Sequence, residues 1–161
     1  MAQLSANRPV PNTLQQRMDL AGGVVVDMVM TVSTTIYEGA FVGYVPATGT
    51  VHPLVDGDAF AGIALKKVVS DATAGSTKVP VYAGGYFQHA VTASAVTSNG
   101  AVVFATSGST DNVLDLTSTT MPAVGRVESW VTGTTCVIKA KSAGYPSGSS
   151  ATPTVITAVE G

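Results

Sequence analysis

The chain has 161 residues, the length of one ordinary domain, and its 8 Lys and Arg against 10 Asp and Glu give a net charge of −2. Charged residues make up only 11% of the sequence, against roughly 25% in most soluble domains. No basic stripe is available to follow nucleic acid or an anionic membrane, and no apolar run approaches the roughly 20 residues of a spanning helix. A surface so poor in charge favours association with a protein partner or with further copies of the chain.

Residues 1–20 are rich in Pro, Asn, Gln and Arg, contain only isolated apolar residues, and lack the apolar core of a secretory signal peptide. Such a segment cannot bury enough apolar surface to fold by itself. We therefore expect synthesis in the cytoplasm and an extended arm at residues 1–20, followed by a folded domain at residues 21–141. The arm residues expected to contact a partner are Leu4, Arg8, Val10, Leu14, Arg17 and Met18.

In residues 21–141, β-branched residues dominate, turn signals recur at short spacing, and no window shows a capped helical period. The pattern predicts an all-β domain built from antiparallel hairpins. The predicted strands cover residues 24–32, 40–45, 50–54, 60–66, 78–82, 86–91, 101–105, 113–116, 124–131 and 134–141. The predicted tight turns contain Thr48-Gly49, Asp56-Gly57, Gly84-Gly85, Asn99-Gly100 and Thr132-Gly133.

Two stretches of this domain resemble each other. GAFVGYVPATGTVHPL, from Gly39, and GAVVFATSGSTDNVLDL, from Gly100, both consist of a strand beginning Gly-Ala, a turn and a short return strand. A glycine-containing strand follows each, around Gly62 and around Gly125, at separations of 23 and 25 residues. Two interpretations stay open: an internal repeat, or chance similarity within a chain rich in Val, Gly and Thr.

Residues 142–161 begin with a Gly-, Ser- and Pro-rich stretch and continue with a short apolar run at residues 155–159. The first part is typical of a linker. The pattern predicts a mobile tail or a short accessory strand.

No residue pattern indicates a metal or cofactor site. His52 and His89 are 37 positions apart, without a metal-ligand spacing, and are expected at the surface or at strand edges. Asp56 and Asp58 flank Gly57 but lack the further ligands of a calcium loop, so a turn is favoured.

Nucleophilic catalysis is not indicated either, and we expect no enzymatic activity. No Gly-x-Ser-x-Gly elbow is present. Cys136 is the single cysteine, which rules out an internal disulfide, and its alternation with Thr134 and Ile138 predicts a buried, inert thiol.

The aromatic residues Trp130, Tyr86 and Phe87 allow two interpretations. They could form a platform on which a sugar ring stacks, which would make the chain a carbohydrate- or host-binding module. Aromatic residues are only 6% of the chain, and Trp130 follows an alternating strand, so packing in the core or at a subunit interface is favoured.

The order of several segments resembles the capsid decoration (cement) proteins of tailed phages. These segments are Phe60-Ala61-Gly62-Ile63-Ala64, VPVYAGGYF from Val79, TSNGAVVF from Thr97 and GRVESWV from Gly125. The resemblance covers residues 20–141. It implies a small antiparallel β-barrel or β-tulip-like subunit with an extended N-terminal arm.

The same resemblance implies a function and a partner. Family members bind the outer surface of the phage head between major capsid protein subunits, commonly as homotrimers, and stabilise the shell. The expected location is therefore the virion, on the outer capsid surface. The alternative is a carbohydrate- or host-binding β-module of the virion.

Overall fold

The computed structural model describes Asn7 and residues 24–105, 113–117 and 122–140, and it confirms the all-β prediction. The described elements are strands and one 3₁₀ turn, η1 (Val96–Ser98). The strands are β1 (Val24–Val29), β2 (Thr35–Ile36), β3 (Phe41–Val45), β4 (Thr50–Pro53), β5 (Ala59–Ala64), β6 (Val68–Val69), β7 (Lys78–Thr92), β8 (Val102–Ala105), β9 (Leu114–Asp115), β10 (Ala123–Thr132) and β11 (Thr135–Ala140).

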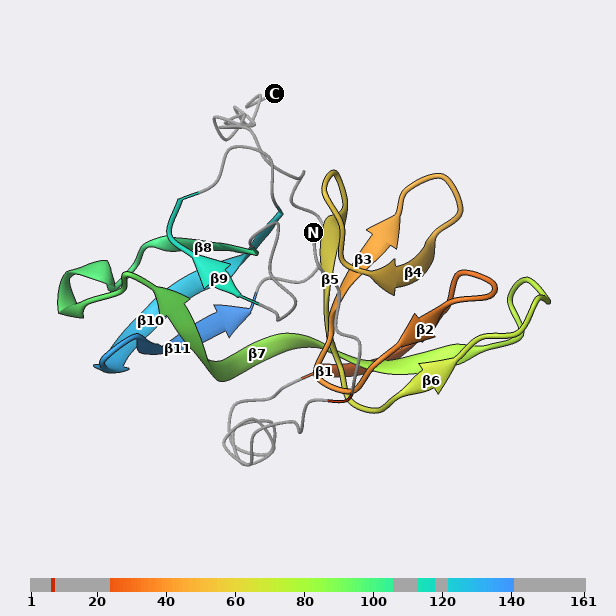
Figure 1. Cartoon of the computed structure of the whole chain (residues 1–161), viewed down its shortest axis with the longest axis horizontal. Coiled ribbons are helices and arrows are strands. Elements are labelled where there is room, and N and C mark those ends of the chain that lie inside the picture. Colours follow the sequence, from red (N-terminus) through yellow and green to blue (C-terminus); the bar gives the residue numbers. More distant parts are fainter. Residues whose placement is uncertain (1–6, 8–23, 106–112, 118–121, 141–161) are drawn as a thin grey trace, which may run out of the picture.

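Five strands form a closed β-barrel in the order β7, β9, β8, β10, β11, and back to β7. The pairing of β11 with residues 85–90 of β7 closes the ring. The β7–β9 pair is parallel, whereas the other pairs of this ring are antiparallel. This barrel is the left-hand lobe in Figure 1.

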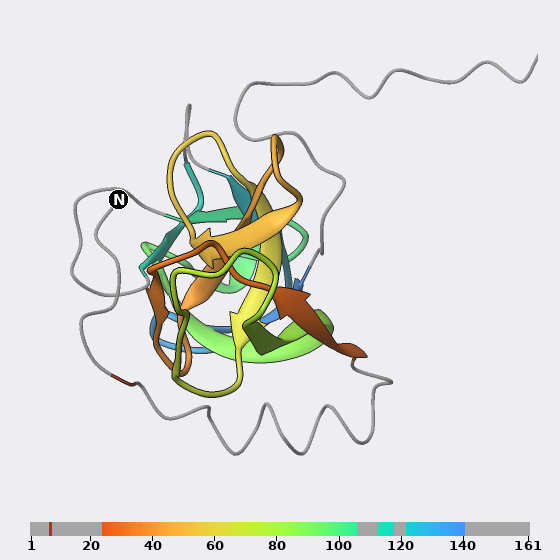
Figure 2. The same cartoon turned by 90° about the vertical axis from the view of Figure 1, so that its right-hand side faces the viewer.

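The earlier part of the chain forms a similar ring on the other half of β7. Here β7 pairs with β5, β5 with β3, and β3 with β4, while β1 pairs with the opposite edge of β7. A single parallel bridge between Met30, just after β1, and Val51 in β4 joins the two ends of this sheet. Figure 2 shows the strands of this half around a common interior, with β2 and β6 forming a separate two-stranded ribbon.

The predicted turn at Gly84-Gly85 is wrong. Residues 78–92 form one continuous 15-residue strand, β7, that runs through both rings. Residues 78–84 of β7 pair with β1, and residues 85–90 pair with β11. The two glycines therefore lie where the strand changes partners, and the φ of +124° at Gly85 is a conformation that side chains rarely adopt. The glycine pair redirects the strand from one ring to the other instead of reversing it.

The two rings contain the same strand bulge. In the β3–β5 ladder, Val42 faces Gly62 and the register shifts before the next pair. In the β8–β10 ladder, Val103 faces Gly125 and the register again shifts at the neighbouring pair. Each bulge thus falls on the residue that precedes the glycine, Ala61 or Val124.

Hydrogen bonds outside the ladders repeat in the same way. The amide of Gly39 donates to the carbonyl of Ala64 at 2.8 Å, and the amide of Gly100 donates to the carbonyl of Val127 at 2.7 Å. The two donors, Gly39 and Gly100, are 61 positions apart. The two acceptors are 63 positions apart, and 63 is also the separation between Gly62 and Gly125.

The parallel contact that completes each ring repeats as well. Met30 bridges Val51 in the first ring, and Val91 pairs with Leu114 in the second. Their offsets are again 61 and 63. Because pairings, bulges and turn hydrogen bonds all agree, the internal repeat is the correct interpretation. We call residues 24–84 the first unit and the described residues between 85 and 140 the second unit.

Each unit has its own apolar core. The first-unit cluster includes Met30, Val42, Val51, Ala61, Ala64, Val79 and Val81. The second-unit cluster has the equivalent residues Val91, Val103, Leu114, Val124, Val127, Cys136 and Ile138.

The outward face of the first unit packs against the second unit. Phe41, Phe60, Ile63 and Tyr82 are buried and belong to the second-unit cluster. The ring of Phe41 lies 5.5 Å from that of His89, centre to centre. Burial also raises the pKa of Tyr82, whose hydroxyl donates to the carbonyl of Tyr86 at 3.2 Å. The units are therefore joined by an apolar interface as well as by β7.

Candidate functional site

The predicted arm lies outside the described residues. This holds for all six proposed contact residues, Leu4, Arg8, Val10, Leu14, Arg17 and Met18. The exception within residues 1–20 is Asn7, whose side-chain oxygen accepts a hydrogen bond from the amide of Glu38 at 3.4 Å. Residues 142–161 also lie outside the described ranges.

Every strongly exposed large apolar side chain in the described residues is a valine. Three are consecutive in β1, which is paired along one edge with β7. The full set is Val24, Val25, Val26, Val32, Val69, Val96 and Val131. No other described strand pairs with β1, and exposed valines on such a strand are typical of a surface that associates with another polypeptide.

A groove of about 600 Å³ lies at the end of the first unit and is partly open to solvent. One wall is the chain that leaves β1, the second is the β3–β4 hairpin, and the third is the loop between β6 and β7. None of the described residues that line it carries a charge. The lining residues are Val29, Met30, Thr31, Val32, Val45, Thr48, Gly49, Thr50, Ala74 and Gly75.

The third wall is held by its own hydrogen bonds. One carboxylate oxygen of Asp71 accepts from the amide of Thr73 at 2.9 Å and from the hydroxyl of Ser76 at 2.6 Å. The Ser76 bond, followed by that from Thr73, lowers the pKa of Asp71. The loop that carries Ala74 and Gly75 is thus a structured turn around one carboxylate.

This wall is an addition to the repeated barrel. In the first unit, Ala64 pairs with Val81, 17 positions later, whereas the equivalent Val127 pairs with Ile138, only 11 positions later. The β10–β11 ladder of the second unit, which is equivalent to the β5–β7 ladder of the first, is thus formed with six fewer connecting residues. The longer connection of the first unit carries β6, which pairs with β2, and its residues Ala74 and Gly75 line the groove.

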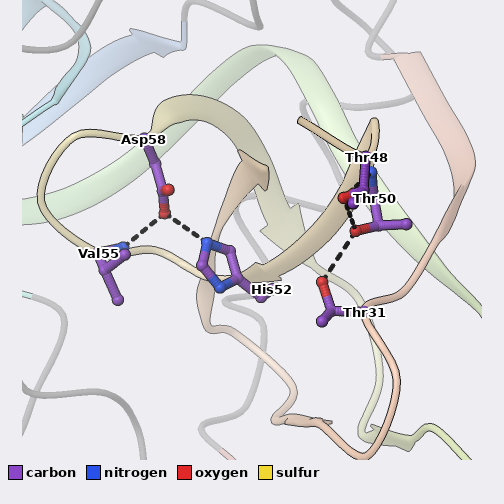
Figure 3. A network of polar contacts seen from close by, with 6 residues as sticks. All are labelled: Thr31, Thr48, Thr50, His52, Val55 and Asp58. Atoms are coloured by element: carbon purple, nitrogen blue, oxygen red, sulfur yellow. Dashed lines mark hydrogen bonds and ion pairs between the residues drawn. The ribbon is translucent and has the colours of Figure 1, made fainter. Parts of the chain in front are cut away.

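Polar side chains around β4 form two groups, shown in Figure 3. Beside the groove, the Thr50 hydroxyl lies 2.9 Å from that of Thr31 and 2.7 Å from that of Thr48. These contacts tie the β3–β4 hairpin to the chain after β1. Two walls of the groove are therefore linked directly.

The second group centres on Asp58. Its Oδ2 accepts from the Val55 amide at 2.8 Å and lies 2.8 Å from Nε2 of His52. The turn predicted around Gly57 is confirmed, with φ of +87° at that glycine. His52 is partly exposed in β4, the last strand in the sheet order, which agrees with the expected strand-edge position, and its contact with Asp58 is a partner that the sequence did not indicate. The two residues are six positions apart in the sequence, and the turn between β4 and β5 brings their side chains together. No sequence motif marks this pair.

His89 and Cys136, the two other residues considered for chemistry, lie in β7 and β11. His89 lies within β7, where its ring contacts Phe41 and Phe87 at the interface between the units. Cys136 is fully buried in the second-unit core, which confirms the prediction of a buried thiol.

The three aromatic residues considered as a sugar platform do not share one surface. Phe87 is buried in the second-unit core. Trp130 packs against the same cluster and donates its indole N–H to the Gly133 carbonyl at 2.8 Å. The prediction that Trp130 contributes to packing is confirmed.

Sequence reasoning missed the groove. Its residues come from three predicted connections and strand ends, and no periodicity marks them. One feature of the sequence could have indicated the groove: residues 67–77 form the longest connection between consecutive predicted strands in the first unit. Asp71 and Ser76 lie within this connection and hydrogen-bond to each other.

Among the described residues, no three His, Cys, Asp or Glu side chains gather as metal ligands would. None of the helical structure within the described ranges has the length and apolar character needed to cross a membrane. No protein-family model, curated protein or solved structure matches the chain.

Proposed function

We propose that this chain is a capsid decoration protein, which binds the outer surface of a phage head between major capsid protein subunits. The observation that carries the proposal is the row of exposed valines Val24, Val25 and Val26 on β1, a strand that pairs only with β7 among the described strands. Together with the low charge of the chain, it supports binding to another protein surface. The sequence resemblance to cement proteins supplies the identity of that surface.

The mechanism is noncovalent clamping. A protein of two units joined by a buried apolar cluster stabilises an assembled lattice when it binds the lattice more tightly than the free capsid subunits. A homotrimer would place equivalent contacts around a three-fold position of the shell. The arm at residues 1–20 would add contacts whose effective concentration rises after the first arm has bound.

The alternative, a carbohydrate- or host-binding module of the virion, gains no specific support from the described side chains. It relied on a stacking surface that included Phe87, and this side chain is only 2% exposed. An enzymatic function is the least supported, because the His52–Asp58 pair holds a turn through the Val55 amide.

The test is binding to empty phage heads from the same genome as this chain, prepared without it and imaged by electron cryomicroscopy. We expect density on the outer surface of expanded heads and no binding to unassembled capsid subunits. Deleting residues 2–18 should weaken decoration while leaving the circular dichroism spectrum unchanged. Heads that stay bare at micromolar protein, combined with saturable binding on a glycan array, would favour the alternative.

A further inference from the structure

We infer that the uncharged groove at the end of the first unit is the binding site for the chain's own C-terminal apolar segment, residues 155–159. This inference does not depend on the proposed function. It rests on the chemistry of the groove, the direction in which β11 leaves the barrel, and the length of chain that follows.

The groove matches this segment in polarity. The described residues of its walls are Val, Met, Ala, Gly and Thr, none of which is charged. Val32 lies on the lining with 40% of its surface exposed, so apolar area is available for burial. Residues 155–159 are Val-Ile-Thr-Ala-Val, an uncharged run rich in β-branched side chains, which suit an extended strand. An extended apolar peptide is the ligand that such a groove fits.

The second barrel delivers the C-terminal chain toward the groove. In β11, Thr135 pairs with Ala90 and Ala140 with Gly85, so the chain at Ala140 is heading toward the Lys78 end of β7. Lys78 pairs with Val29, which is a groove residue. The seven steps from Gly85 back to Lys78 cover about 23 Å at roughly 3.3 Å per strand residue.

The connecting residues are long enough for this path. The 14 residues 141–154 can span at most about 46–50 Å when extended, which is about twice the path along β7. Their Gly-, Ser- and Pro-rich composition suits a linker. A linker of this length gives the segment a millimolar effective concentration at a site on its own chain, so even weak binding is populated.

Binding of residues 155–159 in the groove would also account for the longer connection between β6 and β7 in the first unit. The second unit closes its ladder without the extra residues that carry Ala74 and Gly75, whereas the first unit keeps them in a turn organised by Asp71. The turn that carries Ala74 and Gly75 would hold residues 155–159 against the chain after β1. The bound segment would cover Val32, whose side chain is 40% exposed.

Disulfide trapping tests this placement in the full chain. In a Cys136→Ser background, Ala74→Cys is combined with Ile156→Cys, and the matched control combines Val96→Cys, an exposed valine of the second unit, with Ile156→Cys. We expect an intramolecular disulfide in the Ala74 pair at low micromolar protein, with a yield at least ten-fold above that of the control. Equal yields in both pairs, or disulfide-linked dimers in place of the intramolecular product, would overturn the inference.

A second measurement does not depend on engineered cysteines. Removing residues 152–161 should increase hydrogen exchange at the amides of residues 29–32 at least five-fold, and a synthetic peptide of residues 152–161 should restore protection. Val32→Glu should reproduce the loss in the full chain, whereas Val69→Glu, an exposed valine outside the groove, should not. Unchanged exchange after truncation contradicts tail binding. If Val32→Glu fails to fold, the truncation and peptide results still decide.

Discussion

Gly62 in β5 and Gly125 in β10 are equivalent residues, and each is pressed against the backbone of the next strand. A Cβ atom at Gly62 would collide with the carbonyl oxygen of Tyr82, and one at Gly125 with the carbonyl oxygen of Lys139. Both contacts are with backbone, which cannot turn aside as a side chain can. The close approach follows directly from the bulge that precedes each glycine.

Alanine at either glycine is therefore expected to destabilise the protein. Overpacking of this kind costs about 1–3 kcal/mol, and we expect that loss in the free energy of unfolding of Gly125→Ala. Gly62→Ala should lose more, because a φ of +148° adds backbone strain of about 1–3 kcal/mol. Urea denaturation measures both. Gly84→Ala is the control, since no atom lies within 4 Å of its added Cβ; an equal loss there would contradict the contact explanation.

The sequence predicted the fold class and most strands, because alternation and glycine turns are local signals. It also contained the repeat, which could not be separated from chance similarity, since only pairings across the sheet show that Val42–Gly62 and Val103–Gly125 are equivalent. The turn at Gly84-Gly85 was predicted wrongly for a related reason. A glycine pair permits a reversal and a change of partner equally well, and the partners of β7 lie far away in sequence.

The candidate site was the least predictable part. The predicted arm lies outside the described residues, so it stays a prediction. The groove arises where three connections meet in space, and nothing in the local pattern of Val32 or Ala74 indicates that they share a surface. The Asp71 turn was closer to predictable, since its bonds to Thr73 and Ser76 span only two and five positions.

Asp58→Ala is expected to lower the free energy of unfolding by about 1–3 kcal/mol, the usual cost of leaving buried hydrogen-bonding groups without a partner. The change removes the acceptor shared by the Val55 amide and His52. The neighbouring Asp56→Ala, at an exposed carboxylate of the same turn, should change stability by less than about 0.5 kcal/mol. Thermal unfolding of the two variants compares them, and equal effects would show that Asp58 is not the organising residue.

The loop at residues 71–76 is expected to loosen in acid. Bonds from Ser76 and Thr73 stabilise the Asp71 carboxylate, so its pKa in the folded protein lies below the ordinary value of 3.8. The stabilisation is complete above pH 3.8 and is lost as the pH falls through the lower folded pKa. Exchange of the Thr73 amide, followed by NMR, should rise in that window. Asp71→Asn should abolish the step, and a carboxyl pKa at or above 3.8 would contradict the mechanism.

Cys136 is expected to resist thiol reagents in the folded protein. Its side chain is fully buried in the second-unit core, so modification requires opening of the barrel. Labelling should be complete in denaturant and at least a hundred-fold slower in buffer. Cys136→Ser should destabilise the fold by about 1–3 kcal/mol through burial of a hydroxyl while leaving head binding unchanged. Fast labelling without denaturant would show that the second barrel opens readily.

The last prediction concerns the face that joins the two units. Ile63 pairs with Tyr82 in the first unit, and the equivalent pair in the second unit is Arg126 with Lys139. Ile63 and Tyr82 are buried against the second unit, whereas Arg126 and Lys139 are exposed. Phe41, whose equivalent is Val102, is also buried at this interface. The same barrel face is thus apolar where a second unit covers it and polar where it is exposed, as terminal units of repeat proteins require.

Exchanging residues between the equivalent positions tests this assignment. Ile63→Arg places an unpaired charge in the interface and is expected to abolish cooperative folding or lower the free energy of unfolding by more than about 3 kcal/mol. Arg126→Ile should stay within about 1 kcal/mol of the original chain, because its side chain is exposed and its bond to the Gly100 carbonyl is a surface contact. Phe41→Ala should cost about 3–5 kcal/mol, and Val102→Ala distinctly less. Similar losses for Ile63→Arg and Arg126→Ile in guanidinium denaturation would show that the two faces are not distinguished by burial, and that the interface between the units is not where the structure places it.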